Sequence, residues 1–356
     1  MILDNLKKIK QLSAGQVAES ISFLPDQIRQ ALEEARLIKA PREYNKATQV
    51  VVNGMGGSNL GAGIVKFAFA DQLKAPISIA PGYQLPAHVN KNTLYIISSY
   101  SGATEEPLST YKEAKKRDAK IMAITSSGKG KLEKLMIKDN LPGYIFKPKY
   151  NPSGQPRLGL GYSIFGLAVI MAKAGLLKIK VKEIEDIIAS LEIWDRELRP
   201  AVRTKNNKAK QLAKELFNKQ PVLIAAEFLI GNIKTLRNQL CESSKHFASY
   251  LTLPDLNHFA LEGLVNPASN KKDLIFFFID SNLYHPRIQK RSQLTKEVAK
   301  KNKIKVIDYK LTSSTKLSQA FEMLQLGAWI TYYLSALNSV DPLKIPWVDW
   351  FKKKLN

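Results

Sequence analysis

Apolar residues in the first half of the chain recur with two alternating periods. Short β-branched runs are separated by longer stretches in which apolar positions return every three or four residues. This pattern predicts strands over 47–57, 76–80, 93–102 and 119–128, and helices over 62–73, 104–118 and 130–138. Strands that alternate with helices at these lengths indicate parallel βαβ units, in a sheet covered on both faces.

The same rhythm returns in the second half of the chain. An apolar helical stretch at 162–177 and a charged helical stretch at 181–216 come first. Strands are then predicted over 221–227, 273–280 and 304–310, and helices over 229–248, 288–302 and 318–338. The similar order suggests a duplication, although no repeat of fixed period is visible. We therefore expect an α/β protein with two domains, each a mostly parallel sheet flanked by helices.

Residues 1–45 contain two helical patterns, one of them opening at Ser13 as a possible cap. The domain prediction is accordingly an N-terminal helical segment at 1–45, a first α/β domain at 46–180, a helical connector at 181–210 and a second α/β domain at 211–356.

Composition favours a soluble cytoplasmic protein. Hydrophobic residues make up 45% of the 356 residues, enough for sizeable cores. The longest apolar stretch, at 162–172, stops at Lys173, short of the roughly 20 residues of a membrane helix. No apolar run precedes the first lysines, so the N-terminus does not resemble a signal peptide. A single cysteine, Cys241, excludes an intrachain disulfide and fits a reducing compartment.

The charge is strongly basic, with 54 lysine and arginine residues against 31 acidic ones and a net charge of +23. Such a balance can attract anionic ligands or nucleic acid. The lysines are, however, spread along the chain, and no arginine cluster alternates with aromatic residues. A lysine-rich solvated surface is the favoured interpretation, steering of an anionic substrate comes second, and nucleic-acid binding comes last.

Two strand ends of the first domain carry small, hydroxyl-rich loops, at 54–58 (GMGGS) and 98–104 (SSYSGAT). Ligands of open α/β sheets bind beyond the carboxyl ends of the strands. Hydroxyls and helix N-termini are suitable donors for phosphate, and glycines let the backbone approach the anion. The first loop lacks the Lys-Ser/Thr ending of a Walker loop and the third glycine of a dinucleotide fingerprint. Alone it could be a tight turn, and Thr104 could simply cap a helix. Together the two loops predict phosphate binding.

At these two loops the chain resembles the sugar isomerase (SIS) fold, whose phosphosugar loops read S-x-S-G-x-T. More closely, it resembles the bifunctional phosphoglucose/phosphomannose isomerases of archaea and bacteria. The motifs that carry the resemblance occur in that family's order: NGMGGS, SSYSGATEEPLSTYKEAKKRD, PSGQPRLGLGYS, NQLCESSK, LPDLNHFALEG and FKKKLN. They cover nearly all of the chain beyond the N-terminal helices.

The resemblance implies a role for each matching residue. The phosphate-binding hydroxyls would be those of Ser58, Ser99, Ser101 and Thr104, with Gly56 and Gly57 against the sugar. Glu242 would be the base that moves a proton between C2 and C1 through a cis-enediol, with Arg157 beside the reacting carbons. His258 and Lys352 would open the sugar ring, although Lys353 and Lys354 are alternatives to Lys352. The family also implies a homodimer in which His258 is supplied by the neighbouring subunit.

The residue types suit this chemistry. Glu242 can act as the base if partial burial raises its pKa toward neutrality. Arg157 cannot lose its proton and can stabilise the enediolate charge. His246, four residues after Glu242, is expected to be structural, and Cys241 is expected to be a small buried residue.

The sequence departs from the family's pattern at four places close to these motifs. Ala103 replaces an asparagine, Cys241 replaces an asparagine next to the base, Phe259 follows the histidine, and Ile345 aligns with a threonine held to leave room for both C2 epimers. None removes a catalytic group, but several touch the sugar pocket.

We expect no metal and no cofactor, because the histidines His88, His246, His258 and His285 are scattered without a metal-ligand spacing. The expected function is interconversion of glucose 6-phosphate, and of mannose 6-phosphate, with fructose 6-phosphate. An isomerase for one hexose phosphate, or for another sugar phosphate, remains an alternative. So does a non-catalytic phosphosugar-binding regulator, although Glu242 is present and no helix-turn-helix pattern stands out in residues 1–45.

Overall fold

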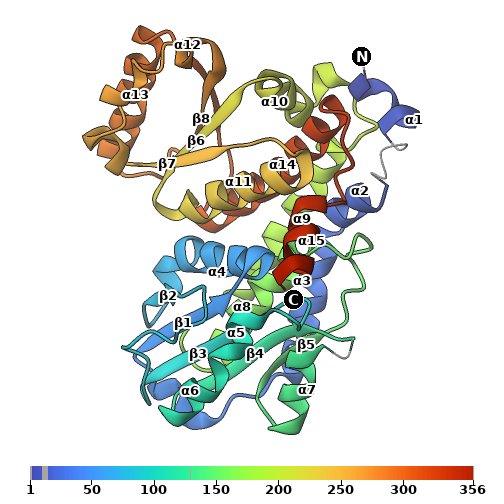
Figure 1. Ribbon diagram of the computed structural model, residues 1–356, viewed down its shortest axis with the longest axis vertical. Coiled ribbons are helices and arrows are strands. Elements are labelled where there is room, and N and C mark those ends of the chain that lie inside the picture. Colours follow the sequence, from blue (N-terminus) through green and yellow to red (C-terminus); the bar gives the residue numbers. More distant parts are fainter. Residues whose placement is uncertain (1, 10–14, 129, 356) are drawn as a thin grey trace. The chain divides into compact units, whose positions relative to one another are not determined.

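The computed structural model describes residues 2–9, 15–128 and 130–355. The chain forms two compact units (Figure 1). The middle unit is Phe23–Ser190, and the terminal unit combines Met1–Ser22 with Leu191–Asn356. Ser13, the expected helix cap, lies outside the described residues. The domain limits inferred from sequence stay a prediction.

The middle unit is built on a five-stranded sheet in the order β2-β1-β3-β4-β5, and every neighbouring pair is parallel. The strands are β1 (Gln49–Gly54), β2 (Ile77–Ile79), β3 (Thr93–Ser98), β4 (Lys120–Ser126) and β5 (Gly143–Phe146). All four predicted strands are present, although those predicted over 47–57 and 93–102 end earlier, at Gly54 and Ser98, and β5 was not predicted. Its four residues, Gly143 to Phe146, are too few to show a periodicity.

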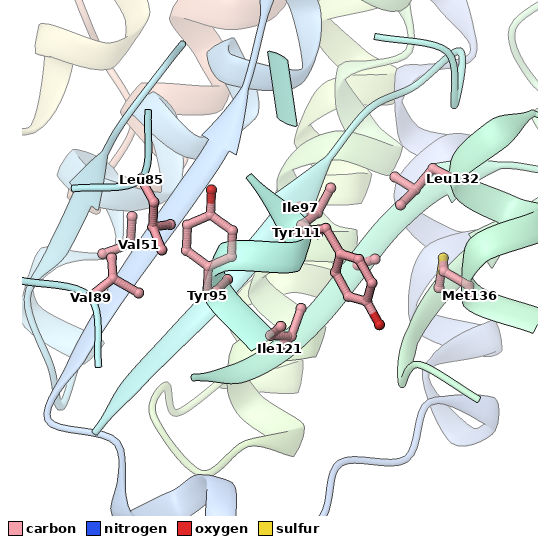
Figure 2. Packing of buried hydrophobic residues seen from close by; sticks show 11 residues of the cluster. Val51, Leu85, Val89, Tyr95, Ile97, Tyr111, Ile121, Leu132 and Met136 are labelled. Atoms are coloured by element: carbon pink, nitrogen blue, oxygen red, sulfur yellow. The ribbon is translucent and has the colours of Figure 1, made fainter. Parts of the chain in front are cut away.

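Helices cover both faces of this sheet. They are α3 (Leu24–Glu34), α4 (Gly56–Ala68), α5 (Glu105–Ser109), α6 (Tyr111–Lys116), α7 (Lys131–Lys138) and α8 (Leu160–Lys173), with short 3₁₀ turns at Ala35–Leu37, Arg42–Lys46, Ala70–Gln72 and Pro156–Leu158. Val51, Tyr95 and Ile121 pair across β1, β3 and β4 and share one face. Figure 2 shows Tyr111 of α6 and Leu132 and Met136 of α7 packed in the same buried cluster as these strand residues.

The opposite face is covered by α8. A Cβ on Gly166 would lie 2.4 Å from Ile124 Cδ1, so this helix contacts β4 closely. Ile124 alternates with Ala123 and therefore points away from the cluster of Figure 2. The predicted covering of both faces is confirmed.

The helix predicted over 104–118 is interrupted, so that prediction was wrong in its length. It breaks at Thr110, whose hydroxyl donates to the carbonyl of Pro107 at 3.0 Å and accepts from the Tyr95 hydroxyl at 2.7 Å. A side chain that binds the preceding turn competes with the regular helical pattern. Two short helices, α5 and α6, result.

The terminal unit contains a four-stranded parallel sheet in the order β7-β6-β8-β9. The strands are β6 (Gln220–Ala226), β7 (Ser249–Leu253), β8 (Leu274–Asp280) and β9 (Lys305–Lys310). Taken in chain order, β6 to β9 repeat the arrangement of β1 to β4 in the middle unit. This shared topology agrees with the expected duplication, and the predicted α/β class is confirmed.

The helices of the terminal unit include α1 (Leu6–Ile9), α2 (Gly15–Ser22), α10 (Lys208–Leu216), α11 (Ile230–Ser244), α12 (Asn270–Asp273), α13 (Pro286–Lys301), α14 (Lys316–Leu337) and α15 (Pro346–Leu355). Its 3₁₀ turns are Ile2–Asp4, Thr204–Asn206, Glu227–Leu229, Asp255–His258 and Glu262–Leu264. Helix α9 (Val181–Leu198) begins in the middle unit and ends in the terminal unit. Among the described residues, no helix has the length and apolar character needed to cross a membrane.

The first residues of the chain are anchored in the terminal unit by a buried lysine. Lys210 Nζ donates to the carbonyls of Val202 at 2.7 Å and Pro200 at 2.9 Å and to the carboxylate of Asp4 at 3.2 Å. The same carboxylate accepts from the amide and hydroxyl of Thr204. Burying an ammonium requires such partners, and here they tie Asp4 to a segment 200 residues further along the chain.

Candidate functional site

The glycine-rich turn after β1 is shaped by contacts within the protein. Gly56 opens α4 with φ +51°, which glycine adopts without a Cβ clash. A Cβ on Gly57 would lie 2.7 Å from the carbonyl carbon of Pro156 and 2.9 Å from the backbone nitrogen of Arg157. A Cβ on Gly54 would lie 2.8 Å from the carbonyl oxygen of Ser98. The glycines therefore let the turn after β1 approach the end of β3 and the segment at Pro156 closely. The sequence alone did not reveal this reason for the glycines.

Ser58 joins the two hydroxyl-rich loops. It is buried in the first turn of α4, and its Oγ accepts a hydrogen bond from the backbone amide of Tyr100 at 2.8 Å. Ser98 Oγ donates to the carbonyl of Ser58 at 3.4 Å. A hydroxyl has one proton to donate besides its lone pairs, and the bond from Tyr100 does not use it. Ser58 thus keeps a donor while fixing the spacing of the loops.

The second loop is closed by its own hydroxyls. Ser99 is buried, and its Oγ donates to Thr104 Oγ1 at 2.8 Å. Ser101 is exposed, and its Oγ accepts from the amide of Ala103 at 3.3 Å. Thr104 occupies the N-cap position of α5, but its side chain makes no capping hydrogen bond. The alternative that Thr104 serves only as a helix cap is therefore wrong.

The helix dipole contributes less to this loop than sequence reasoning expected. Helix α5 has only five residues, whereas α4 has 13. Aligned peptide dipoles add up along a helix, so α4 is the helix whose N-terminus favours an anion here. At residues 99–104 the donors are hydroxyls and backbone amides.

Tyr100 and Asn151 complete the framework, and neither was singled out from the sequence. The Tyr100 hydroxyl accepts from Asn151 Nδ2 at 2.7 Å, and the same amide group donates to the carbonyl of Gln155 at 3.0 Å. Burial raises the pKa of Tyr100 to about 12, so the phenol stays protonated at neutral pH. Tyr100 lies inside one motif that carried the family resemblance, and Asn151 directly precedes another, at Pro152; that placement was the signal available.

Arg157 is buried, with 1% of its surface exposed, which excludes the alternative of a surface-loop arginine. Its Nη1 donates to Gln155 Oε1 at 2.7 Å. A guanidinium keeps its charge when buried, and it is a favourable partner for an anion. Because Gly57 contacts the backbone of Arg157, the cation is attached to the same framework as the two loops.

The corresponding strand ends of the terminal unit are acidic. Glu227, directly after β6, has φ +48°, as Gly56 has φ +51° after β1. Its carboxylate accepts from the amide of His285 at 3.1 Å. Asp280 ends β8, where Ser98 ends β3. Carboxylates repel a phosphate, so these two strand ends of the terminal unit are less suited to an anion than the hydroxyl-rich loops of the middle unit.

The predicted catalytic residues of the terminal unit lie on three different elements. Glu242 is half-buried in the last turn of α11. His258 ends the 3₁₀ turn Asp255–His258 and is exposed. Lys352 lies on α15 and is exposed, as are Lys353 and Lys354.

His246 has the contacts of a structural residue. Its Nδ1 lies 3.2 Å from Asn338 Nδ2, and its Nε2 lies 2.6 Å from the carbonyl of Lys219. A neutral ring that accepts at Nδ1 and donates at Nε2 satisfies both partners. Cys241 is a free cysteine of intermediate exposure rather than a buried one. Over the described ranges, no group of three histidine, cysteine or acidic side chains could hold a metal.

Comparisons with known proteins bear on both units. A family model described as the SIS domain matches residues 43–137. A model described as the bacterial phospho-glucose isomerase C-terminal SIS domain matches residues 205–355. The predicted pair of SIS domains is therefore confirmed.

Full-length relatives are also similar to this chain. A bifunctional phosphoglucose/phosphomannose isomerase of Caldicellulosiruptor bescii is 33% identical over 95% of this chain and 98% of its own. One of Thermoplasma volcanium is 26% identical over 96% and 99%. A solved structure of a hypothetical protein from Thermus thermophilus matches with a TM-score of 0.76 at 16% identity, over 98% of this chain and 93% of that one. At that identity the structural likeness supports the fold alone.

Proposed function

Since the chain belongs to the family of bifunctional phosphoglucose/phosphomannose isomerases and is an aldose–ketose isomerase of sugar phosphates, we propose that it interconverts glucose 6-phosphate and mannose 6-phosphate with fructose 6-phosphate. The observation that carries this proposal is the pair of loops joined by the bond from Tyr100 N to Ser58 Oγ at 2.8 Å. These loops supply the hydroxyl donors that a phosphate ester requires.

The phosphate is bound by Ser58, Ser99, Ser101 and Thr104, and the sugar lies against Gly56 and Gly57. Three supports come from the middle unit: the hydroxyls are held by mutual hydrogen bonds, α4 directs its N-terminus to the same loops, and Arg157 adds a buried positive charge. Preorganised donors of this kind bind an anion without a large ordering cost.

Glu242 is the base of the isomerisation. Its carboxylate takes the proton from C2 of the open-chain aldose and returns it to C1, while the C2 hydroxyl proton moves to the oxygen on C1. The intermediate is a cis-enediol, and Arg157 stabilises the negative charge that develops on its oxygens. The two epimers at C2 form the same enediol once that proton has left, so one site serves glucose and mannose phosphates. Arg157 supplies the charge stabilisation that a metal ion would otherwise give, so the reaction is metal-free.

His258, with Lys352, transfers the proton that opens the sugar ring. We propose that His258 comes from the neighbouring subunit of a homodimer in the reducing cytoplasm. Support comes from the exposure of His258 and from Phe259 beside it, an aromatic side chain that is 57% exposed. Aromatic residues of this kind are enriched in subunit interfaces.

Mixing inactive Glu242→Gln and His258→Ala subunits is expected to restore part of the activity, because one site of the hybrid dimer would keep both groups.

A narrower substrate range is the second candidate. It is favoured by Ala103 and Phe259, which replace residues usual in the family, and by Ile345, which aligns with a threonine held to leave room for both epimers. In that case one of the two hexose phosphates, or another sugar phosphate, would be the only good substrate.

A coupled assay in EDTA, started from fructose 6-phosphate, tests these proposals. Formation of both glucose and mannose 6-phosphates supports the bifunctional reaction, and formation of one supports the narrower range. If neither forms while fructose 6-phosphate still binds, the chain would be a phosphosugar-binding protein instead. Loss of turnover in EDTA that is restored by a divalent cation would contradict the metal-free mechanism.

A further inference from the structure

Lys245 ends α11 in a conformation that is unusual for its residue type. It is the C-terminal cap of the helix, with φ 51° and ψ 36°, in the left-handed region. Glycine is the usual residue at this position because a Cβ is unfavourable there. The conformation alone assigns no role, because Lys303 also has a positive φ, so the contacts of the Lys245 side chain decide.

The ammonium of Lys245 binds the helix end from which it comes. Its Nζ donates to the carbonyl of Glu242 at 2.8 Å and to the carbonyl of Asp341 at 2.7 Å. The last carbonyls of a helix have no amide partner within the helix. Lys245 satisfies the carbonyl of Glu242 and ties it to the segment that follows α14.

The neighbouring residues hold the same helix end against α14. Ser244 Oγ donates to the carbonyl of Thr331 at 3.0 Å, and Asn338 Nδ2 donates to the carbonyl of Ser244 at 3.0 Å. His246 N donates to the carbonyl of Leu240 at 3.0 Å, which closes the last turn. These bonds fix the residues on either side of the cap, and Lys245 contacts the backbone of Glu242 itself.

We propose that Lys245 is a positioning residue for the isomerisation, holding the last turn of α11 so that the Glu242 carboxylate meets the C2 proton. This inference rests on the proposed role of Glu242 as the base. The base of a proton transfer must lie within hydrogen-bond distance of the proton that it abstracts. Displacements of about 1 Å reduce rates by about 10²-fold, so a looser helix end affects kcat more than substrate binding.

Lys245→Gly separates positioning from stability. Glycine adopts the left-handed cap at least as well as lysine but lacks the ammonium. We expect kcat to fall by about ten- to hundredfold, KM to change by less than about threefold, and the melting temperature to be maintained. Lys245→Asn, which also tolerates the cap but is too short to reach Asp341, should behave alike. Lys245→Arg should recover part of kcat, because it restores a donor to both carbonyls.

Lys303→Gly is the matched control. Lys303 is an exposed lysine of the terminal unit with φ 62°, and it follows α13 rather than α11. Its kcat and KM should equal those of the unchanged protein. A Lys245→Gly enzyme with a kcat within about twofold of that protein would overturn the proposal, as would an equal loss in Lys303→Gly.

Hydrogen exchange distinguishes a failure of this proposal from a failure of the proposed function. In Lys245→Gly, the amides of residues 243–246 should exchange faster than in the unchanged protein, whether or not the chain isomerises sugars. Unchanged exchange would contradict the proposal that Lys245 restrains this helix end. If the unchanged protein has no isomerase activity but the variant shows the expected faster exchange, the role of Glu242 is contradicted. The proposal that Lys245 restrains the end of α11 would then still hold.

Discussion

Gly57 and Arg157 lie in direct backbone contact, because a Cβ built on Gly57 would be 2.9 Å from the nitrogen of Arg157. Helix α4 and the loop that carries the buried guanidinium are thus held at a separation that admits only a hydrogen atom. The two hydroxyl-rich loops and the cation therefore belong to one contiguous framework.

Gly57→Ala tests this framework. The added methyl group must displace Pro156 and Arg157, so we expect a loss of about 1–3 kcal/mol in the free energy of unfolding, together with a raised KM for fructose 6-phosphate. Urea unfolding and initial rates measure the two effects. Gly15→Ala is the control, because a Cβ there would have no neighbour within 4 Å among the described residues. Equal stability of the two variants would contradict the close contact.

Ser101→Ala should weaken substrate capture without affecting the fold. The side chain is exposed, so its loss leaves the free energy of unfolding unchanged. A hydrogen bond to a charged phosphate contributes about 1.5–3 kcal/mol, which corresponds to a rise of about ten- to hundredfold in KM. Ser109→Ala, at an exposed serine of α5, should keep KM. An unchanged KM in Ser101→Ala would count against the phosphate loop.

Glu242→Gln should lower kcat by about 10²- to 10⁴-fold, because the amide has the shape of the carboxylate but cannot take a proton. Binding of fructose 6-phosphate, measured by calorimetry, should remain close to that of the unchanged protein. Isomerisation at a near-normal rate would show that another group is the base.

Alkaline pH should destabilise the protein partly through Tyr100. Burial raises the pKa of Tyr100 to about 12, above the value of about 10 expected in the unfolded chain. The protonated phenol therefore contributes its full stabilisation below pH 10, and that contribution is lost as the pH rises through about 12. Two pKa units correspond to at most about 3 kcal/mol. Between pH 10 and 12 the unfolding free energy of Tyr100→Phe should fall less steeply than that of the unchanged protein.

Much of the fold could be predicted because the central strands of parallel sheets are continuous apolar runs. Residues 274–280 and 93–98 are of this kind. The missed strand β7 lies at a sheet edge, where its residues are mostly half-buried and their pattern is mixed. The helix predicted over 229–248 ran four residues too far, since its end is formed by Lys245 in a left-handed conformation and no glycine marks it.

The candidate site, like the fold, could be predicted only in part. Hydroxyls and glycines signal their chemistry through their type and spacing, so Ser58 and Ser101 could be selected from the sequence. Tyr100 and Asn151 act through partners 42 and 51 residues away, Ser58 and Tyr100, and such pairings exist only in the folded chain. Contacts of that kind have no local signature.

The arrangement of the chain ends has a consequence for biosynthesis. The carboxylate of Asp4 pairs with Lys210, 206 residues later, and the carbonyl of Ile21 accepts from Gln325, 304 residues later. The segments that contain Asp4 and Ile21 are translated before the middle unit, and the side chains that bind them are translated after it. The terminal unit can therefore finish folding only after Gln325 has been translated, and a fragment expressed from Leu191 onward would lack the carboxylate that pairs with Lys210.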